Sequence, residues 1–286
     1  MTFSTKKFFE TDGIRGRSGL EPITEGFARR LGYSYGEILS HRFVGNVTVL
    51  VGRDTRISGT TLESALVKGL LRAGVSVELL GVVPTPALAF SVKESRAVGG
   101  VVVSASHNRF EDNGFKLFDE HGEKLPRVTE ELLENSLNSI GDIDESNSNS
   151  VGKYFSDWEE NYIELCLGNG QKSLTLEGRK IVVDCAHGST YKIAPKILDL
   201  CNAAVSTIGC SPSGYNINEA VGSTNPQALI QAVRTRQADI GVAFDGDGDR
   251  VLMVDERGDI LDGDDILFVL AKYYVSTNGM SGGVVG

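Results

Sequence analysis

Residues 47–81 read VTVLVGRDTRISGTTLESALVKGLLRAGVSVELLG, and this stretch decides the fold class. Val47 to Val51 is an apolar run of strand length, followed by a polar loop over residues 52–56. Leucines at 62, 66 and 70 repeat at helical spacing, which predicts a helix from Gly59 to Arg72. Val75 to Leu80 is a second apolar run. A strand, a helix and a strand in this order indicate an α/β protein with buried strands.

The same order recurs from residue 180 onward. Apolar runs at Ile181 to Val183 and Ala204 to Ile208 flank a predicted helix from Lys192 to Leu200. Asp54 and Asp184 open the equivalent loops of the two copies. We interpret this repetition as an internal duplication of a strand-helix-strand module, which predicts two similar α/β domains.

Domain boundaries follow from composition. Residues 142–150 (DIDESNSNS) are polar and lack periodicity, so we expect a first domain at 1–155 and a second at 156–255. Residues 256–286 resemble the start of a third unit and end in Gly-Gly-Val-Val-Gly, which has the look of a strand just beginning. We expect this chain to be cut from a longer protein, because such a strand lacks its partners.

Composition limits the classes of partner. The chain has 286 residues, of which 41% are hydrophobic and 23% charged, and its net charge of -10 argues against a nucleic-acid partner. Its four cysteines have no spacing typical of zinc sites and are expected to be reduced thiols. We expect no membrane association and a cytoplasmic location, because no apolar run is long enough for a signal or membrane segment.

The most charged turn lies between two apolar runs, Ile240 to Phe244 and Val251 to Val254. Asp245, Asp247 and Asp249 alternate with glycines, which lets the backbone curl so that the three carboxylates converge on one hard cation. The spacing partly fits a calcium-binding EF-hand, but arginine stands at position 6, where glycine is needed, and the flanks read as strands. The pattern therefore favours Mg²⁺, with a solvated acidic turn as the alternative.

Two further turns offer candidate phosphate chemistry. Ser106 follows the apolar run Val101 to Val103, where an open α/β sheet places its ligands, and Lys116 in the segment Asp112 to Lys116 could face the same spot. Arg15, in the glycine-bracketed turn 11–16, could hold a phosphate through two parallel N–H bonds. The alternatives are a polar turn capped by His107 and a solvated surface arginine.

Six segments occur in an order that resembles the α-D-phosphohexomutase superfamily. They are residues 11–16 (TDGIRG), 52–56 (GRDTR), 84–86 (PTP), 104–108 (SASHN), 112–116 (DNGFK) and 245–250 (DGDGDR). The resemblance runs from Phe8 to Gly286, and the first, fourth and fifth segments are most similar to its phosphoglucosamine mutase branch. It implies two similar α/β/α domains with mixed sheets and the start of a third.

The resemblance also implies an activity. A phosphoryl group on Ser106 would pass to the 1-hydroxyl of glucosamine 6-phosphate, which gives a bisphosphate that turns over in the cleft. The 6-phosphoryl group would then return to Ser106 and leave glucosamine 1-phosphate. Asp245, Asp247, Asp249 and an oxygen on Ser106 would ligate one Mg²⁺. The remaining site residues implied are Arg15, Lys116 and Arg250 at the phosphate, with Lys116 handling a proton through a lowered pKa, and His107 in a supporting role.

Departures from the family pattern leave other functions open. Arg109 stands where the family usually has proline, which removes a fixed φ and predicts a looser serine loop. The segments that select the sugar and hold the distal phosphate in full-length members are absent, so we expect weak turnover. Phosphomannomutase or phosphoglucomutase activity, a phosphatase, and a non-catalytic metal- and phosphate-binding remnant are the alternatives. A homodimer is also left open.

Overall fold

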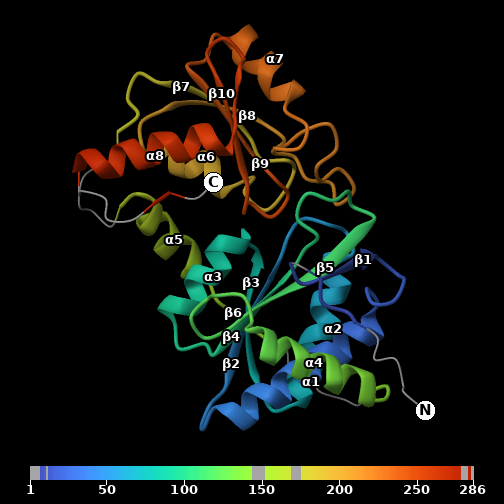
Figure 1. Ribbon diagram of the computed structural model, residues 1–286. Coiled ribbons are helices and arrows are strands. Elements are labelled where there is room, and N and C mark those ends of the chain that lie inside the picture. Colours follow the sequence, from blue (N-terminus) through green and yellow to red (C-terminus); the bar gives the residue numbers. More distant parts are fainter. Residues whose placement is uncertain (1–6, 11, 144–151, 169–174, 278–282, 285–286) are drawn as a thin grey trace.

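The computed structural model describes residues 7–10, 12–143, 152–168, 175–277 and 283–284. Two mixed β-sheets, each with helices on both faces, follow one another along the chain (Figure 1). The α/β class and the two similar domains with mixed sheets that the sequence predicted are therefore confirmed.

The first sheet has parallel strands at its centre and antiparallel strands at one edge. Its spatial order is β1 (Ile14–Arg17), β5 (Asp112–Phe118), β4 (Gly99–Val103), β2 (Thr48–Arg53), β3 (Ser76–Val82) and β6 (Lys153–Tyr154). One face packs against α1 (Glu25–Arg42), α2 (Gly59–Arg72) and α4 (Arg127–Ser139). The other face packs against α3 (Thr85–Glu94) and α5 (Trp158–Cys166). Both faces are thus covered, as a central parallel sheet requires.

The second sheet repeats this arrangement. Its spatial order is β11 (Ile260–Leu261), β10 (Val251–Asp255), β9 (Ile240–Phe244), β7 (Lys180–Asp184) and β8 (Ala204–Ile208). One face packs against α7 (Gln227–Arg236) and the other against α6 (Ile193–Leu200). The last helix, α8 (Gly263–Thr277), has no buried residue.

The duplication extends beyond the two modules that the sequence revealed. In both sheets, two parallel strands (β2 and β3, or β7 and β8) are followed by a third parallel strand, β4 or β9. On its other side, that third strand pairs with an antiparallel strand, β5 or β10. The β4–β5 loop contains Ser106 and is called the serine loop, and the β9–β10 loop contains Asp245 to Arg250 and is called the acidic loop. The serine loop and the acidic loop therefore stand at equivalent positions of the two sheets.

Apolar periodicity explains the elements that were predicted. Leu62, Leu66 and Leu70 of α2 are all buried in the core, and the helix has the predicted bounds. The Pro84-Thr85-Pro86 segment begins α3 at Thr85, with Pro84 as its N-cap. Proline is favoured at the first turn of a helix because the N–H it lacks has no partner there.

The segment between the sheets packs on the first sheet. β6 pairs with β3, and the Trp158 Nε1 of α5 donates a hydrogen bond to the Leu80 carbonyl at 3.1 Å. β11 places Ile260 and Leu261 at the edge of the second sheet. The bounds 1–155, 156–255 and 256–286 stay a prediction, and the predicted strand at 282–286 falls mostly outside the described residues.

Among the described helices, none combines the length and apolar character needed to cross a bilayer.

Candidate active site

The serine loop and the acidic loop meet directly. The Ser106 hydroxyl is fully buried and donates a hydrogen bond to Asp245 Oδ2 at 2.6 Å. Gly246 lies so close to the serine loop that an added Cβ would stand 2.5 Å from the Ser106 carbonyl oxygen. Glycine at this position is therefore a steric requirement for the approach of the two loops.

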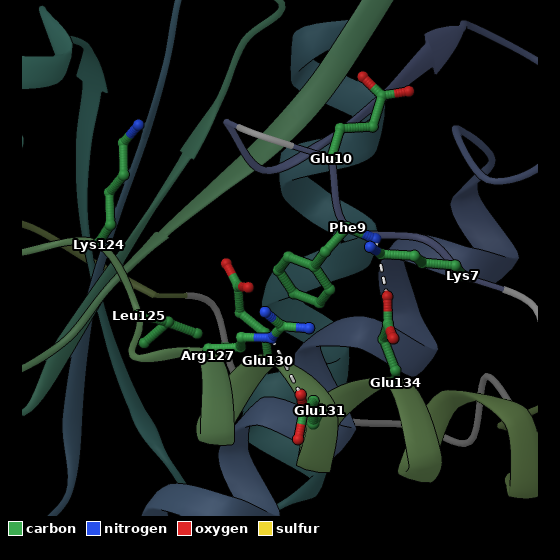
Figure 2. Close-up of a pocket in the computed structure, with 9 residues that line it drawn as sticks. All are labelled: Lys7, Phe9, Glu10, Lys124, Leu125, Arg127, Glu130, Glu131 and Glu134. Atoms are coloured by element: carbon green, nitrogen blue, oxygen red, sulfur yellow. Dashed lines mark hydrogen bonds and ion pairs between the residues drawn. The ribbon is translucent and has the colours of Figure 1, made fainter.

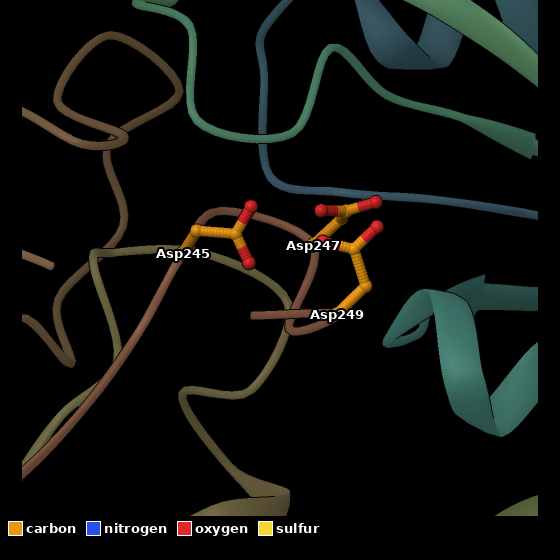
Figure 3. Close-up of side chains that lie close together, drawn as sticks. All are labelled: Asp245, Asp247 and Asp249. Atoms are coloured by element: carbon orange, nitrogen blue, oxygen red, sulfur yellow. The ribbon is translucent and has the colours of Figure 1, made fainter. Parts of the chain in front are cut away.

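The three aspartates of the acidic loop point toward one another (Figure 3). Each offers one carboxylate oxygen, and these oxygens all lie within 4.8 Å of one another. Burial, followed by the negative charge of Asp247, raises the pKa of Asp245 to about 7. Burial also acts to raise the pKa of Asp247, but Lys116 and Thr85 outweigh it and hold that pKa below its ordinary value.

These residues fit a hard divalent cation. Carboxylate oxygens are the ligands that Mg²⁺ accepts, and Asp247 Oδ1 is buried with no hydrogen-bond partner among the described residues. A buried carboxylate oxygen without a partner is costly unless a ligand satisfies it. A phosphoryl group on Ser106 would add further negative charge beside the three carboxylates, which a cation would offset.

Lys116 links β5 to this cluster. Its Nζ lies 2.7 Å from both Asp247 Oδ2 and Asp249 Oδ2, and 3.1 Å from Asp12 Oδ2. Burial alone would lower the pKa of Lys116, but the charges and hydrogen bonds of Asp247 and Asp249 raise it above its ordinary value. The expectation of a lowered pKa for this lysine is therefore wrong for the chain as folded here, because its neighbours are carboxylates.

Asp12 forms ion pairs with three cationic side chains near the site. Its carboxylate lies 2.5 Å from Arg15 Nη2 and 2.6 Å from Lys124 Nζ, in addition to Lys116. Arg15 comes from β1, which is paired with β5 opposite Gly114. The structure thus brings Arg15 and Lys116 together through a shared carboxylate. Asp12 was not among the predicted site residues, although it stands within the quoted segment 11–16; Thr11 of that segment lies outside the described residues.

His107 and Arg250 lie beside the same loops. The His107 Nδ1 is 3.5 Å from Ser106 Oγ, and burial, then the charges of Arg250 and Arg15, lower the pKa of His107. The Arg250 side chain is half exposed, with its Nε 4.0 Å from Asp249 Oδ1. Its backbone N–H donates to Asp245 Oδ1 at 3.2 Å. All the predicted site residues are therefore found around one point, at the junction of the two sheets.

Two residues that hold the serine loop were missed. Arg56 is 1% exposed and donates to four backbone carbonyls, those of Ser106, Asn108, Arg109 and Asp112, as well as to Asp54 Oδ2. Asn218, from the second half of the chain, donates to Ser106 O and Asn108 O. Arg56 belongs to the quoted segment 52–56, so its position was visible, whereas nothing in the sequence indicated Asn218.

Arg109 makes contacts with both halves of the chain, and the looser loop expected from it stays a prediction. Its guanidinium lies 3.1 Å from Glu219 Oε1 and its carbonyl oxygen accepts a hydrogen bond from Arg56. The neighbouring Phe110 packs edge-on against Tyr215, with ring centroids 5.3 Å apart. Contacts to the second half thus hold the loop where the fixed φ of a proline is missing.

A cavity of about 890 Å³ adjoins the site at the start of α4 (Figure 2). Phe9, Lys124, Leu125 and Glu130 line it and also line a smaller cavity that includes Asp12 and Lys116. The larger lining carries four glutamates and three cations, so an anionic ligand gains no net attraction there. No pattern in the sequence predicted this cavity.

Known proteins share both the fold and the sequence of this chain. A phosphoglucosamine mutase of Haemophilus ducreyi is 48% identical over 281 residues, which cover 98% of this chain and 63% of the relative. A phosphoglucosamine mutase of Pseudomonas fluorescens is 48% identical over 282 residues, covering 99% and 63%. This chain therefore spans 63% of the length of each of these two curated relatives.

A solved structure agrees with this likeness. A phosphoglucomutase/phosphomannomutase family protein of Burkholderia thailandensis superposes with a TM-score of 0.81 at 30% identity, over 95% of this chain and 59% of that one. The profile of phosphoglucomutase/phosphomannomutase α/β/α domain I matches residues 6–144, and that of domain II matches residues 160–258. The chain therefore belongs to the phosphoglucomutase/phosphomannomutase family.

Proposed function

We propose that this chain carries the phosphoryl-transfer site of a phosphoglucosamine mutase, which interconverts glucosamine 6-phosphate and glucosamine 1-phosphate. The observation that carries the proposal is the 2.6 Å contact between the Ser106 hydroxyl and Asp245, within a cluster of three aspartates. Relatives at 48% identity bear the name phosphoglucosamine mutase, which favours an amino-sugar phosphate as substrate.

Two transfers complete the reaction. In the first, the bond from phosphorus to Ser106 Oγ breaks as a bond forms to the 1-oxygen of glucosamine 6-phosphate, and the 1-hydroxyl proton passes to the oxygen that leaves. In the second, the bond from phosphorus to the 6-oxygen of the bisphosphate breaks as a bond forms to Ser106 Oγ, and the Ser106 hydroxyl proton passes to the 6-oxygen. This releases glucosamine 1-phosphate and restores the phosphorylated serine. The transition state of a phosphoryl transfer is loose, so it needs positioning and charge neutralisation more than a strong nucleophile.

The residues divide these tasks. Asp245, Asp247, Asp249 and the oxygen on Ser106 would hold Mg²⁺, which would draw charge from the transferring group. Lys116 and Arg15 lie in the same region, where both are paired with Asp12. They would contact phosphoryl oxygens, which would replace Asp12 and the other carboxylates as their partners. Arg250 would join the acidic loop to the phosphate, and His107, beside Ser106 Oγ, would support the serine loop.

The proposal also covers the modification, the cofactor, the substrate class, the location and the assembly. Phosphorylation of Ser106, the use of Mg²⁺, a hexosamine phosphate substrate, a cytoplasmic location and a homodimer all stay proposals. Phosphomannomutase or phosphoglucomutase activity is the second candidate, because the structural relative from Burkholderia thailandensis bears that family's name.

Intact mass spectrometry tests the proposal. The dephosphorylated chain is incubated with glucosamine 1,6-bisphosphate and Mg²⁺, and we expect it to gain one phosphoryl group at Ser106. Ser106→Ala should gain none, and chelation of the metal should stop the gain in the unaltered chain. Ser139→Ala, which changes an exposed serine of α4, is the matched control and should gain the group as the unaltered chain does.

Different bisphosphates separate the two candidate activities. A rate of phosphorylation highest with glucosamine 1,6-bisphosphate supports phosphoglucosamine mutase, and a higher rate with the mannose or glucose compound supports the alternative. The proposal of a phosphoserine mutase is abandoned if no hexose bisphosphate phosphorylates the unaltered chain in the presence of Mg²⁺.

A further inference from the structure

Arg56, from the first half of the chain, and Asn218, from the second half, donate hydrogen bonds to the same two carbonyl oxygens of the serine loop. Arg56 Nη2 lies 2.9 Å from Ser106 O and 2.8 Å from Asn108 O. Asn218 Nδ2 lies 2.9 Å and 2.8 Å from the same two oxygens. Each carbonyl oxygen has two lone pairs, so it can accept from both donors at once.

The residue between these contacts has an unfavourable backbone. Ser106 has a φ of +52°, in the left-handed region that a residue with a side chain rarely adopts. Such a conformation persists only where its surroundings over-determine it. Here it directs the buried Ser106 hydroxyl at Asp245, so the same contacts that hold the backbone also set the direction of Oγ.

Among the described residues, the Asn218 side chain donates hydrogen bonds only to this loop. An amide nitrogen has two hydrogens, and both acceptors of Asn218 Nδ2 are serine-loop carbonyls. Its Oδ1 is buried with no partner among the described residues, so the amide is not needed to satisfy its own neighbours. Asn218 itself has a φ of +57°, and its backbone N–H is tied to the Ala186 carbonyl at 2.8 Å.

We propose that Asn218 is a positioning residue for Ser106, through which the second half of the chain fixes the direction of the serine hydroxyl relative to the acidic loop. The inference deepens the proposed function and rests on it for its kinetic test. Arg56 holds the loop to the first sheet and Asn218 holds it to the second, so the hydroxyl meets Asp245 only while both contacts exist. A small misorientation of a reacting oxygen is enough to slow transfer strongly.

Two substitutions separate the backbone of Asn218 from its amide. Asn218→Gly keeps the left-handed φ without strain but removes both hydrogen bonds. Asn218→Asp keeps the shape and replaces the donor by a charged acceptor facing two carbonyl oxygens. Asn225→Ala is the matched control, because Asn225 is an exposed asparagine of the same segment.

The first measurement is the rate of Ser106 phosphorylation as a function of bisphosphate concentration. We expect the maximal rate to fall about 10-fold in Asn218→Gly and about 100-fold in Asn218→Asp. The half-saturating concentration and the Mg²⁺ affinity of Asn218→Gly should stay within about 2-fold of the unaltered chain, because a positioning role acts on the transfer step rather than on binding. Asn225→Ala should match the unaltered chain.

The second measurement does not require phosphorylation. Amide hydrogen exchange of peptides that cover residues 104–111 should be faster in Asn218→Gly than in Asn225→Ala, since the loop loses one of its two anchors. Unchanged exchange, an unchanged maximal rate, or a loss confined to the half-saturating concentration would each overturn the inference. If the unaltered chain takes up no phosphoryl group, the proposed function fails, and the exchange measurement still decides the role of Asn218.

Discussion

Arg56 shows how much one side chain contributes to the candidate site. Its guanidinium is fully buried, paired with Asp54 at 2.8 Å, and donates hydrogen bonds to four backbone carbonyls between Ser106 and Asp112. Arginine suits this place because its planar fork carries five donors in fixed directions, whereas a lysine offers one compact charge. Asp54 also accepts from Ser104, whose hydroxyl in turn accepts from the Ser106 N–H. One buried ion pair therefore organises the loop from both ends.

Asp12 gives a prediction at the same scale. Partial burial alone would raise its pKa, but Lys124 and Lys116 outweigh burial and lower the pKa to about 2 from 3.8. A lowered folded-state pKa adds stability above the unfolded value, and this contribution is lost as the pH falls from about 4 to about 2. Asp12→Asn should therefore lower the free energy of unfolding by about 1 kcal/mol at pH 6, a figure reduced for solvent screening.

Urea unfolding at a series of pH values checks this expectation. The difference between Asp12→Asn and the unaltered chain should shrink as the pH falls below about 4. Glu131→Gln, which alters the exposed pair with Arg127, is the control and should change stability by less than about 0.5 kcal/mol. A difference for Asp12→Asn that is independent of pH would contradict the role given to the two lysines.

At the scale of elements, α1 and α2 cross at unusually short range. Gly69 of α2 lies against the Arg29 carbonyl of α1, and Gly32 of α1 lies against the Leu66 carbonyl of α2, so that a Cβ at either position would overlap backbone. The helices carry the buried side chains that cover one face of the first sheet. Their close approach therefore depends on glycine at both positions.

Gly69→Ala tests this packing. Helix propensity alone predicts a gain of about 1 kcal/mol from alanine in a helix. We expect the opposite, a loss of about 2 kcal/mol or more, because the backbone atoms it would meet cannot move aside. Gly26→Ala in the first turn of α1 is the matched control, since a Cβ there meets nothing within 4 Å, and it should be neutral or stabilising. Equal effects of the two variants in thermal unfolding would show that the crossing has room to relax.

At the scale of the whole molecule, the candidate site exists because two similar sheets present equivalent loops to one another. Thr55 Oγ1 donates to the His187 carbonyl at 2.6 Å, and the Ile57 N–H donates to the Gly214 carbonyl at 2.9 Å. Thr85 Oγ1 donates to Asp247 Oδ2 at 2.5 Å. The two halves thus meet at several loops, and a metal at Asp247 would be linked to the first half through Thr85 as well as to its own loop.

Metal binding should therefore stabilise the folded chain. A cation that binds only the folded state at about 100 times its dissociation constant adds about 2.7 kcal/mol, which corresponds to a rise in melting temperature of roughly 5 to 10 °C. Asp247→Asn should abolish the rise caused by Mg²⁺. Asp262→Asn, an exposed acidic residue before α8, should keep it. A rise of the same size in both variants, measured by thermal unfolding, would place the cation elsewhere.

Local sequence determined the elements and the chemistry of the site. Apolar periodicity predicted α2, α6 and the central strands, because burial of one face is a local pattern along the chain. The alternation of glycine and aspartate at 245–250 predicted converging carboxylates, because that convergence depends only on a few neighbouring residues. The duplication, and with it the two sheets, was also visible as a repeated order of elements.

Tertiary structure decided the contacts between segments that are distant in the sequence, and the pKa values that depend on them. The contact of Asn218 with the serine loop joins residues 112 positions apart, and no local pattern records such a pairing. The raised pKa of Lys116 has the same origin, since Asp247 and Asp249 reach it only after both sheets have formed. Side-chain identity fixes which charges are available, but their pKa values and partners depend on distances that only the folded chain establishes.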